Sequence, residues 1–124
     1  MTTTTAAAAL LLCLPLAAPA AQHIADITWS DSAYRHAVTL APGRFFEACG
    51  RLDAGAAVRW QFEAAAALDF NIHYHQGKDV IYPAQLRAVA QAADTLAVKL
   101  AQDYCWMWTN RGSAPVRLDL RLQR

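Results

Sequence analysis

The segment Leu68–His75, with the sequence LDFNIHYH, decides the fold. Its apolar residues (Leu, Phe, Ile, Tyr) alternate with polar ones (Asp, Asn, His, His) at every position. Side chains at successive positions of a strand point to opposite faces, so this segment has one apolar face and one polar face. It therefore predicts a β-strand with one face in a protein core and the other in solvent.

The same alternation recurs on both sides of this segment. The stretch Val58–Glu63 reads VRWQFE, Thr95–Leu100 reads TLAVKL, and Val116–Gln123 reads VRLDLRLQ. Turn-forming residues separate such stretches, for example at Asn110–Ser113. Short strands divided by turns predict an all-β chain, folded as a small antiparallel β-sandwich of about six to eight strands.

Two stretches lack a clear strand pattern. Ala64–Ala67 is expected to be a connection, because so short a run of alanine cannot nucleate a helix alone. Ala84–Ala93 fits a helical turn, and it also fits a short strand followed by a loop. Pro83 is expected to end a short strand at Asp79–Tyr82, since proline cannot donate to a central ladder.

Residues 1–20 have the pattern of an export signal. Ala6–Leu16 is apolar and uncharged, and the small-residue sequence APA follows at 18–20. This pattern predicts a signal peptide cleaved after Ala20, and hence a periplasmic or secreted protein. The apolar run is shorter than the roughly 20 residues of a spanning helix, so the mature form is expected to have no membrane span.

Two of the three cysteines belong to the predicted mature chain. Cys13 lies inside the signal, which leaves Cys49 and Cys105. An even number of cysteines in an oxidising compartment predicts a disulfide between them. The alternative is a copper site, because Met107 shares strand parity with Cys105 and both offer soft sulfur ligands. The two interpretations exclude each other, since a bridged sulfur is no longer a thiolate ligand.

A second candidate metal site is the His-x-His pair His73 and His75. Residues two apart in a strand share a face at about 6.6–7 Å, so two imidazoles can converge on copper or zinc. The remaining ligands would come from a small set of candidates: His23, His36, Glu63, Asp79 and Met107. The alternative is that both histidines belong to the solvated polar face of Leu68–His75.

The late aromatic stretch also admits two interpretations. Tyr104, Trp106 and Trp108 share one face of a predicted strand, opposite Cys105. They either fill the core of a small sandwich or form an exposed aromatic row beside Arg111. The exposed row would be a binding surface for a partner protein, a sugar or a lipid headgroup.

Charge and motif content exclude several function classes. The formal net charge is +1 with acids and bases interspersed, so no basic stripe predicts nucleic-acid binding. There is no glycine-rich phosphate loop, no metalloprotease helix and no spacing that pairs Cys105 with a catalytic base. We therefore expect a protein that is not an enzyme and has no cofactor, unless copper or zinc binds at the histidines.

Five segments occur in a familiar order. They are FEAC at 46–49, VRWQF at 58–62, LDFNI at 68–72, DYCWMWTN at 103–110 and the closing strand at 116–122. Together they resemble the Golgi-dynamics (GOLD) domain family, a small β-sandwich. In its cargo-receptor branch, two cysteines at the places of Cys49 and Cys105 form a disulfide, although here Tyr104 adjoins the cysteine directly.

The resemblance implies a stand-alone binding module. No coiled coil, membrane span or sorting tail accompanies the five segments, so cargo-receptor activity is not expected. We divide the chain into a signal peptide (1–20), a lead-in with the first strand (21–43) and the GOLD-like sandwich (44–124). The predicted function is an exported, non-catalytic module that binds an unknown protein or small ligand; the alternative is a periplasmic metal-binding protein.

Overall fold

The computed structural model describes residues 23–124, so the predicted signal peptide lies outside the described residues. This part of the chain forms seven strands. In chain order they are β1 (His23–Asp26), β2 (Ala33–Leu40), β3 (Phe45–Leu52), β4 (Ala57–Gln76), β5 (Asp79–Ala97), β6 (Gln102–Thr109) and β7 (Val116–Gln123). Residues 23–124 contain no helix, and hence none that could cross a membrane.

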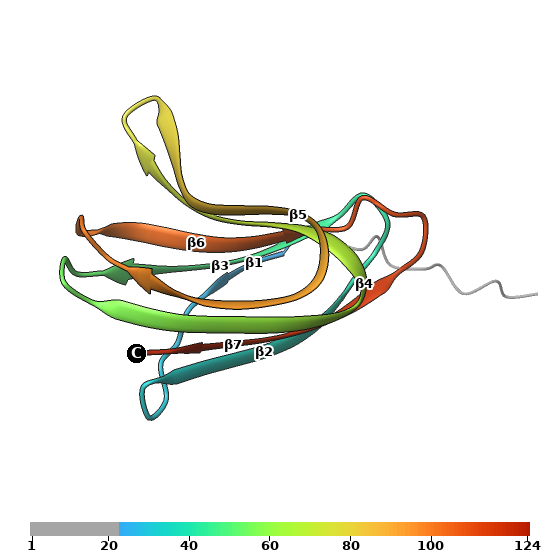
Figure 1. Cartoon of the computed structure of the whole chain (residues 1–124), viewed down its shortest axis with the longest axis horizontal. Coiled ribbons are helices and arrows are strands. Elements are labelled where there is room, and N and C mark those ends of the chain that lie inside the picture. Colours follow the sequence, from blue (N-terminus) through green and yellow to red (C-terminus); the bar gives the residue numbers. More distant parts are fainter. Residues whose placement is uncertain (1–22) are drawn as a thin grey trace, which may run out of the picture.

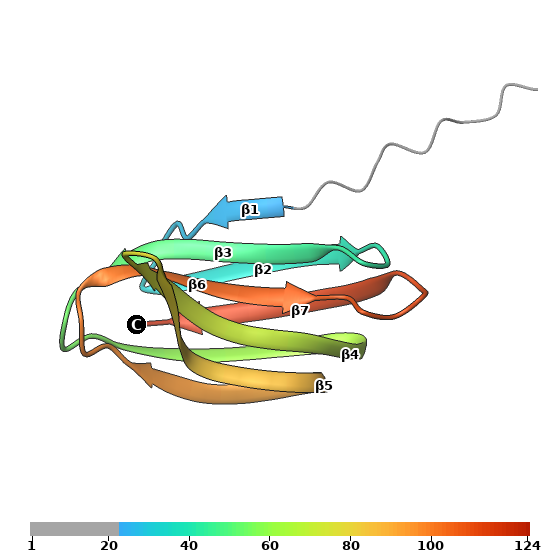
Figure 2. The same cartoon turned by 90° about the horizontal axis from the view of Figure 1, so that it is seen from above.

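The strands form one sheet that curls into two layers (Figures 1 and 2). Strand β4 belongs to both layers, because its first part pairs with β7 and its later part pairs with β6. Strand β2 continues the β7 side, and β3 followed by β1 continues the β6 side. We call these the β2–β7 layer and the β1–β3–β6 layer. All pairings are antiparallel except that of β1 with β3.

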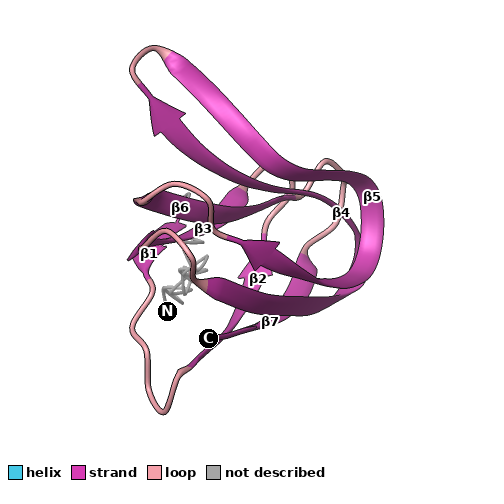
Figure 3. Ribbon diagram, turned by 60° about the vertical axis from the view of Figure 1, so that its left-hand side comes forward, coloured by secondary structure: helices cyan, strands magenta, loops and turns pink. Residues whose placement is uncertain are grey.

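Strands β4 and β5 form a long bent hairpin that joins the layers. It curves round one side of the molecule in Figure 3, and its tip stands out beyond the body in Figure 1. The pairing register shifts between Glu63 and Leu68. The connection expected at Ala64–Ala67 is therefore wrong: these alanines continue β4 through the bend, where small side chains crowd neither layer.

The two interpretations of Ala84–Ala93 are both replaced by continuous strand. Strand β5 also runs through Pro83, which lies at the register shift opposite Ile72 and Tyr74 of β4. Proline is tolerated at such an irregularity and on an edge strand, because no ladder hydrogen bond is lost there. Within residues 23–124, β5 pairs only with β4, so its other edge is free.

The core fills the space between the layers. The predicted apolar face of Leu68–His75 supplies Leu68, Phe70 and Ile72, each at most 2% exposed. An aromatic cluster surrounds Phe70, with ring centroids 4.8 to 5.3 Å from its own in Trp60, Phe62 and Trp108. Such tilted and edge-on contacts favour aromatic packing beyond the area buried.

The disulfide closes the β1–β3–β6 layer. Cys49 of β3 and Cys105 of β6 are direct partners in the strand register and are bonded through their sulfur atoms. The prediction of an all-β sandwich with one disulfide is confirmed. The lead-in at 21–43 contains two strands, the edge strand β1 and then β2, which begins at Ala33.

Candidate functional site

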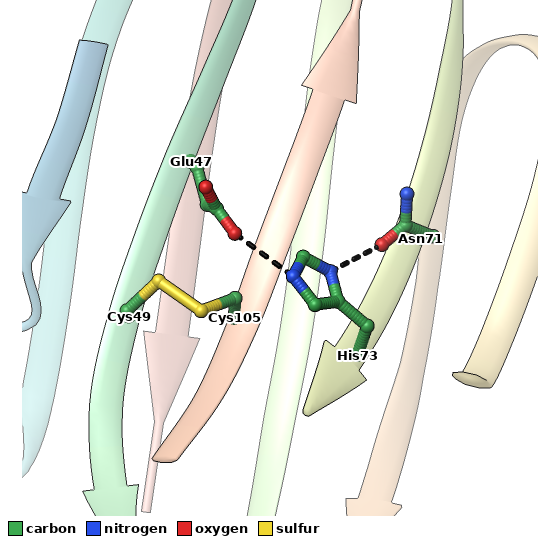
Figure 4. Close-up of a disulfide and its surroundings, with 5 residues drawn as sticks. All are labelled: Glu47, Cys49, Asn71, His73 and Cys105. Atoms are coloured by element: carbon green, nitrogen blue, oxygen red, sulfur yellow. Dashed lines mark hydrogen bonds and ion pairs between the residues drawn. A yellow bond between two sulfur atoms is a disulfide. The ribbon is translucent and has the colours of Figure 1, made fainter. Parts of the chain in front are cut away.

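A buried ion pair lies on the outer face of the β1–β3–β6 layer (Figure 4). Nε2 of His73, on β4, lies 3.0 Å from Oε1 of Glu47, on β3. The two side chains are only 8% and 12% exposed. Nδ1 of the same imidazole lies 2.8 Å from Oδ1 of Asn71. Both ring nitrogens of His73 are therefore held by oxygen atoms.

Strand register brings this cluster together. Two adjacent rows of residues cross β3, β6 and β4: Cys49, Cys105 and His73 form one, and Glu47, Met107 and Asn71 form the other. Alternate residues of a strand share a face, so all six project away from the core. Figure 4 shows the disulfide lying beside the ion pair.

The contacts of His73 fit more than one arrangement of protons. A neutral imidazole has one N–H, and an imidazolium has two. A neutral ring with its N–H at Nε2 donates to Glu47, and the Asn71 amide then turns its NH2 group toward Nδ1. If Nδ1–H donates to Asn71 instead, a second proton or a metal ion between Nε2 and Glu47 satisfies the 3.0 Å contact.

Three potential metal ligands meet here. Atoms of Glu47, His73 and Cys105 all lie within 4.8 Å of one another, and all three residues are buried. In this form Cys105 is bridged, so its sulfur is not a thiolate. The intact disulfide therefore excludes the predicted copper site of Cys105 and Met107.

The structure separates the two predicted histidines. His75 is exposed, whereas His73 is 6% exposed, and their rings meet edge-on at 5.4 Å between centroids. The interpretation of a solvated polar face thus holds for His75 and is wrong for His73. Metal binding by the His73–His75 pair stays a prediction. His75 does not belong to the buried cluster of potential ligands.

Of the other predicted ligands, Met107 lies on β6 between Glu47 and Asn71, and the rest lie elsewhere. The ring of His36 stacks on Phe46 with centroids 4.6 Å apart, and burial, followed by the nearby His23, lowers the pKa of His36. Glu63 belongs to the β2–β7 layer and Asp79 to the hairpin tip. The residue that sequence reasoning missed is Glu47. Its position two residues before Cys49 on one strand face was the available signal.

The predicted exposed aromatic row is wrong. Tyr104, Trp106 and Trp108 are 2%, 0% and 1% exposed, so they belong to the core and offer no binding surface. The reason is that their face of β6 points between the layers. Arg111 is exposed, but its Nε donates to Asp69 Oδ2 at 2.9 Å and helps to hold the turn after β6.

Two surface features remain. The β4–β5 hairpin carries exposed apolar side chains: Val80, Ile81 and Tyr82 lie near its tip, on both faces of β5, and Leu86 lies farther along β5, opposite Phe70. A groove of about 860 Å³ lies over the β2–β7 layer, where Arg35 faces Arg121 and Glu63 faces Asp119 across paired strands. The groove therefore carries both signs of charge side by side.

Solved structures share this fold. A periplasmic inhibitor of g-type lysozyme from Aeromonas hydrophila, PliG, is 13% identical, with 81% of this chain and 96% of that chain covered and a TM-score of 0.52. PliG from Salmonella Typhimurium is 9% identical, with 83% and 98% covered and a TM-score of 0.55. The pre-peptidase C-terminal domain of a Bacillus anthracis collagenase is 8% identical, with 86% and 99% covered and a TM-score of 0.61.

These likenesses concern the fold, because the identities are low. No protein-family model matches the sequence, and no curated protein matches it. None of the three structures is described as a GOLD domain, so the GOLD resemblance stays a prediction.

Proposed function

We propose that the chain is an exported, non-catalytic β-sandwich that binds a protein partner through the tip of its β4–β5 hairpin. The observation that carries this proposal is the run of exposed apolar side chains Val80, Ile81 and Tyr82 near the tip of a strand whose outer edge is free. A small domain that leaves neighbouring large apolar side chains in solvent gains free energy when a partner covers them.

The chemistry of the tip favours a protein over other partners. A free strand edge offers unpaired N–H and C=O groups to an extended chain, while the side chains provide apolar contacts. A sugar-binding surface would require several aromatic rings for stacking, and Tyr82 is the one aromatic residue among these exposed apolar side chains. Binding to an anionic lipid surface would require clustered basic residues. At the tip, the basic Lys78 is followed directly by the acidic Asp79, so their charges offset each other.

The solved structures of the same fold support both export and a protein partner. Two of the three described above are periplasmic proteins that inhibit g-type lysozyme. The predicted signal peptide and the disulfide agree with export of this chain. We take a g-type lysozyme as the first partner to test.

Two experiments test the proposal, and in both of them Ile24 is the control position. Ile81 is 37% exposed at the tip, and Ile24 is 62% exposed on β1, at the opposite edge of its layer. A photo-crosslinking amino acid at Tyr82 of the exported protein should give one discrete protein adduct, and the same amino acid at Ile24 should give none. Inhibition of a g-type lysozyme by the mature chain should weaken about 30-fold in Ile81→Ala and remain unchanged in Ile24→Ala.

The outcomes distinguish the general proposal, a protein partner, from the specific one, a g-type lysozyme. An adduct at Tyr82 without lysozyme inhibition supports a protein partner and rejects lysozyme. No adduct and no inhibition would overturn the proposed function, as would equal adducts at positions 82 and 24.

A further inference from the structure

We propose that reduction of the Cys49–Cys105 disulfide creates a zinc site whose ligands are Cys105, His73 and Glu47. This inference does not rest on partner binding at the hairpin tip, because it is argued from the buried cluster of the β1–β3–β6 layer. The two sites are neighbours, since the ring of Tyr82 lies 5.9 Å from that of His73 between centroids. It differs from the His73–His75 site predicted by sequence in two of its three ligands.

The site is largely built before any metal arrives. The ligand atoms of the three residues lie within 4.8 Å of one another on adjacent strands, so a small movement would bring them to metal-binding distances. Asn71 already orients the imidazole, since its Oδ1 lies 2.8 Å from Nδ1 of His73. Such an outer hydrogen bond fixes the tautomer and directs the other nitrogen, Nε2, toward the metal.

For metal binding, the cluster in the oxidised chain lacks only a free sulfur and the negative charge of its thiolate form. In the oxidised chain, Nε2 of His73 lies 3.0 Å from Oε1 of Glu47, and the sulfur of Cys105 is bonded to that of Cys49. Reduction frees the Cys105 sulfur beside them. A divalent ion bound by this sulfur, by Nε2 and by the carboxylate would compensate the buried negative charge and favour the thiolate, the form of cysteine that binds metal.

The reduction step follows ordinary thiol–disulfide exchange with a dithiol reductant. One thiolate of the reductant attacks the sulfur of Cys49, the more exposed of the two residues, and Cys105 leaves as a thiolate beside His73. The second thiolate of the reductant then attacks the mixed disulfide and releases Cys49. The reductant becomes a cyclic disulfide, having given two electrons, and metal binding to Nε2 of His73 and to the Cys105 thiolate releases to solvent any proton that these atoms carry.

The ligand set selects the metal. Thiolate, imidazole and carboxylate ligands suit Zn²⁺, whereas Mg²⁺ and Ca²⁺ require oxygen ligands. Three protein ligands leave a fourth tetrahedral position open toward Cys49 or water.

The test uses Co²⁺ as a coloured substitute for Zn²⁺, followed by competition with Zn²⁺ itself. The reduced chain should bind one equivalent and show a thiolate-to-cobalt charge-transfer band, while the oxidised chain should show none at the same concentration. Glu47→Leu combined with His73→Leu removes two ligands without leaving one buried charge unpaired, and it should abolish the band. Asn71→Ala should weaken affinity at least tenfold. His75→Ala is the matched control and should bind as the wild type does.

A second variant guards against loss of the fold. Cys49→Ala leaves Cys105 as a free thiol without any reductant, and near-ultraviolet circular dichroism of the buried tryptophans reports whether the chain is folded. A folded Cys49→Ala chain that binds no Co²⁺ would overturn the proposal. So would equal binding by the oxidised chain or by the double leucine variant. If the reduced chain and Cys49→Ala both lose their native signal, the site exists in no folded form and the proposal also fails.

Discussion

Nε2 of His73 lies 3.0 Å from Oε1 of Glu47, on a sheet face where alternation alone predicts solvent. Removing one partner of a buried hydrogen-bonded pair leaves the other group unpaired, which costs about 1–3 kcal/mol. We therefore expect His73→Leu and Glu47→Leu each to lower the free energy of unfolding by roughly that amount. The double variant should cost clearly less than the two together, as measured by urea denaturation. Additive effects would contradict a coupled pair, and His75→Leu should change stability by less than about 0.5 kcal/mol.

The disulfide gives a second prediction. It joins residues 56 apart in sequence, and closure of such a loop stabilises a fold by about 4 kcal/mol in the chain-entropy model. Replacing both Cys49 and Cys105 by Ala should lower the free energy of unfolding by that order. A reductant should destabilise the wild type to a similar degree and leave the double variant unchanged. If the reductant affected both equally, its action would not depend on this bond.

Asn110 connects two turns from within the core. It is 0% exposed, its Nδ2 donates to the carbonyls of Leu40 and Ala114, and its Oδ1 accepts from the N–H of Gly112. Asn110→Asp keeps the shape but presents an oxygen where two carbonyls require a donor. We expect it to cost about 3 kcal/mol or more in thermal or urea unfolding, and Asn110→Ala a similar amount. Gln76→Ala removes an exposed amide and should cost less than about 0.5 kcal/mol.

The sequence predicted the strands more completely than it predicted the residues of the candidate site. The pattern of Leu68–His75 was sufficient for its strand and its core face, because alternation is a local property. The alanines at 64–67 and the stretch 84–93 gave no such pattern. The stretch 84–93 is strand because β5 pairs with β4, and the alanines continue β4 through the register shift between Glu63 and Leu68, both of which pair with β5. That pairing depends on contacts between residues distant in sequence.

The burial of His73 could not be predicted either, since it depends on neighbours from β3, β5 and β6. Glu47 was within reach. Once Cys49 and Cys105 are taken as partners, a residue two positions before Cys49 must share the outer face with the disulfide. The polar partner of a buried histidine could have been sought there.

Asp69 gives the prediction for acid pH. Its Oδ1 accepts the backbone N–H of Ala88 at 3.0 Å, where β5 has a positive φ of 51°, and its Oδ2 accepts from Arg111. The hydrogen bond from Ala88, followed by the contact with Arg111, lowers the pKa of Asp69 below its ordinary value of 3.8. Folding therefore favours the ionised carboxylate. The resulting stability is fully present above pH 3.8 and is lost as the pH falls through the lower pKa of the folded state.

Comparison with Asp69→Asn isolates this contribution. The variant should unfold at a lower temperature than the wild type at pH 7, by an amount equivalent to about 1–2 kcal/mol, because a neutral amide accepts weaker hydrogen bonds. The gap should close as both proteins are brought from pH 5 to pH 2, since the wild type alone loses this carboxylate. Asp103→Asn tests an exposed pair with Arg51 at 4.0 Å and should show almost no gap at pH 7. A gap for Asp69→Asn that persists unchanged at pH 2 would mean that its cause is the altered shape of the β5 bulge, and the charge would have no part in holding it.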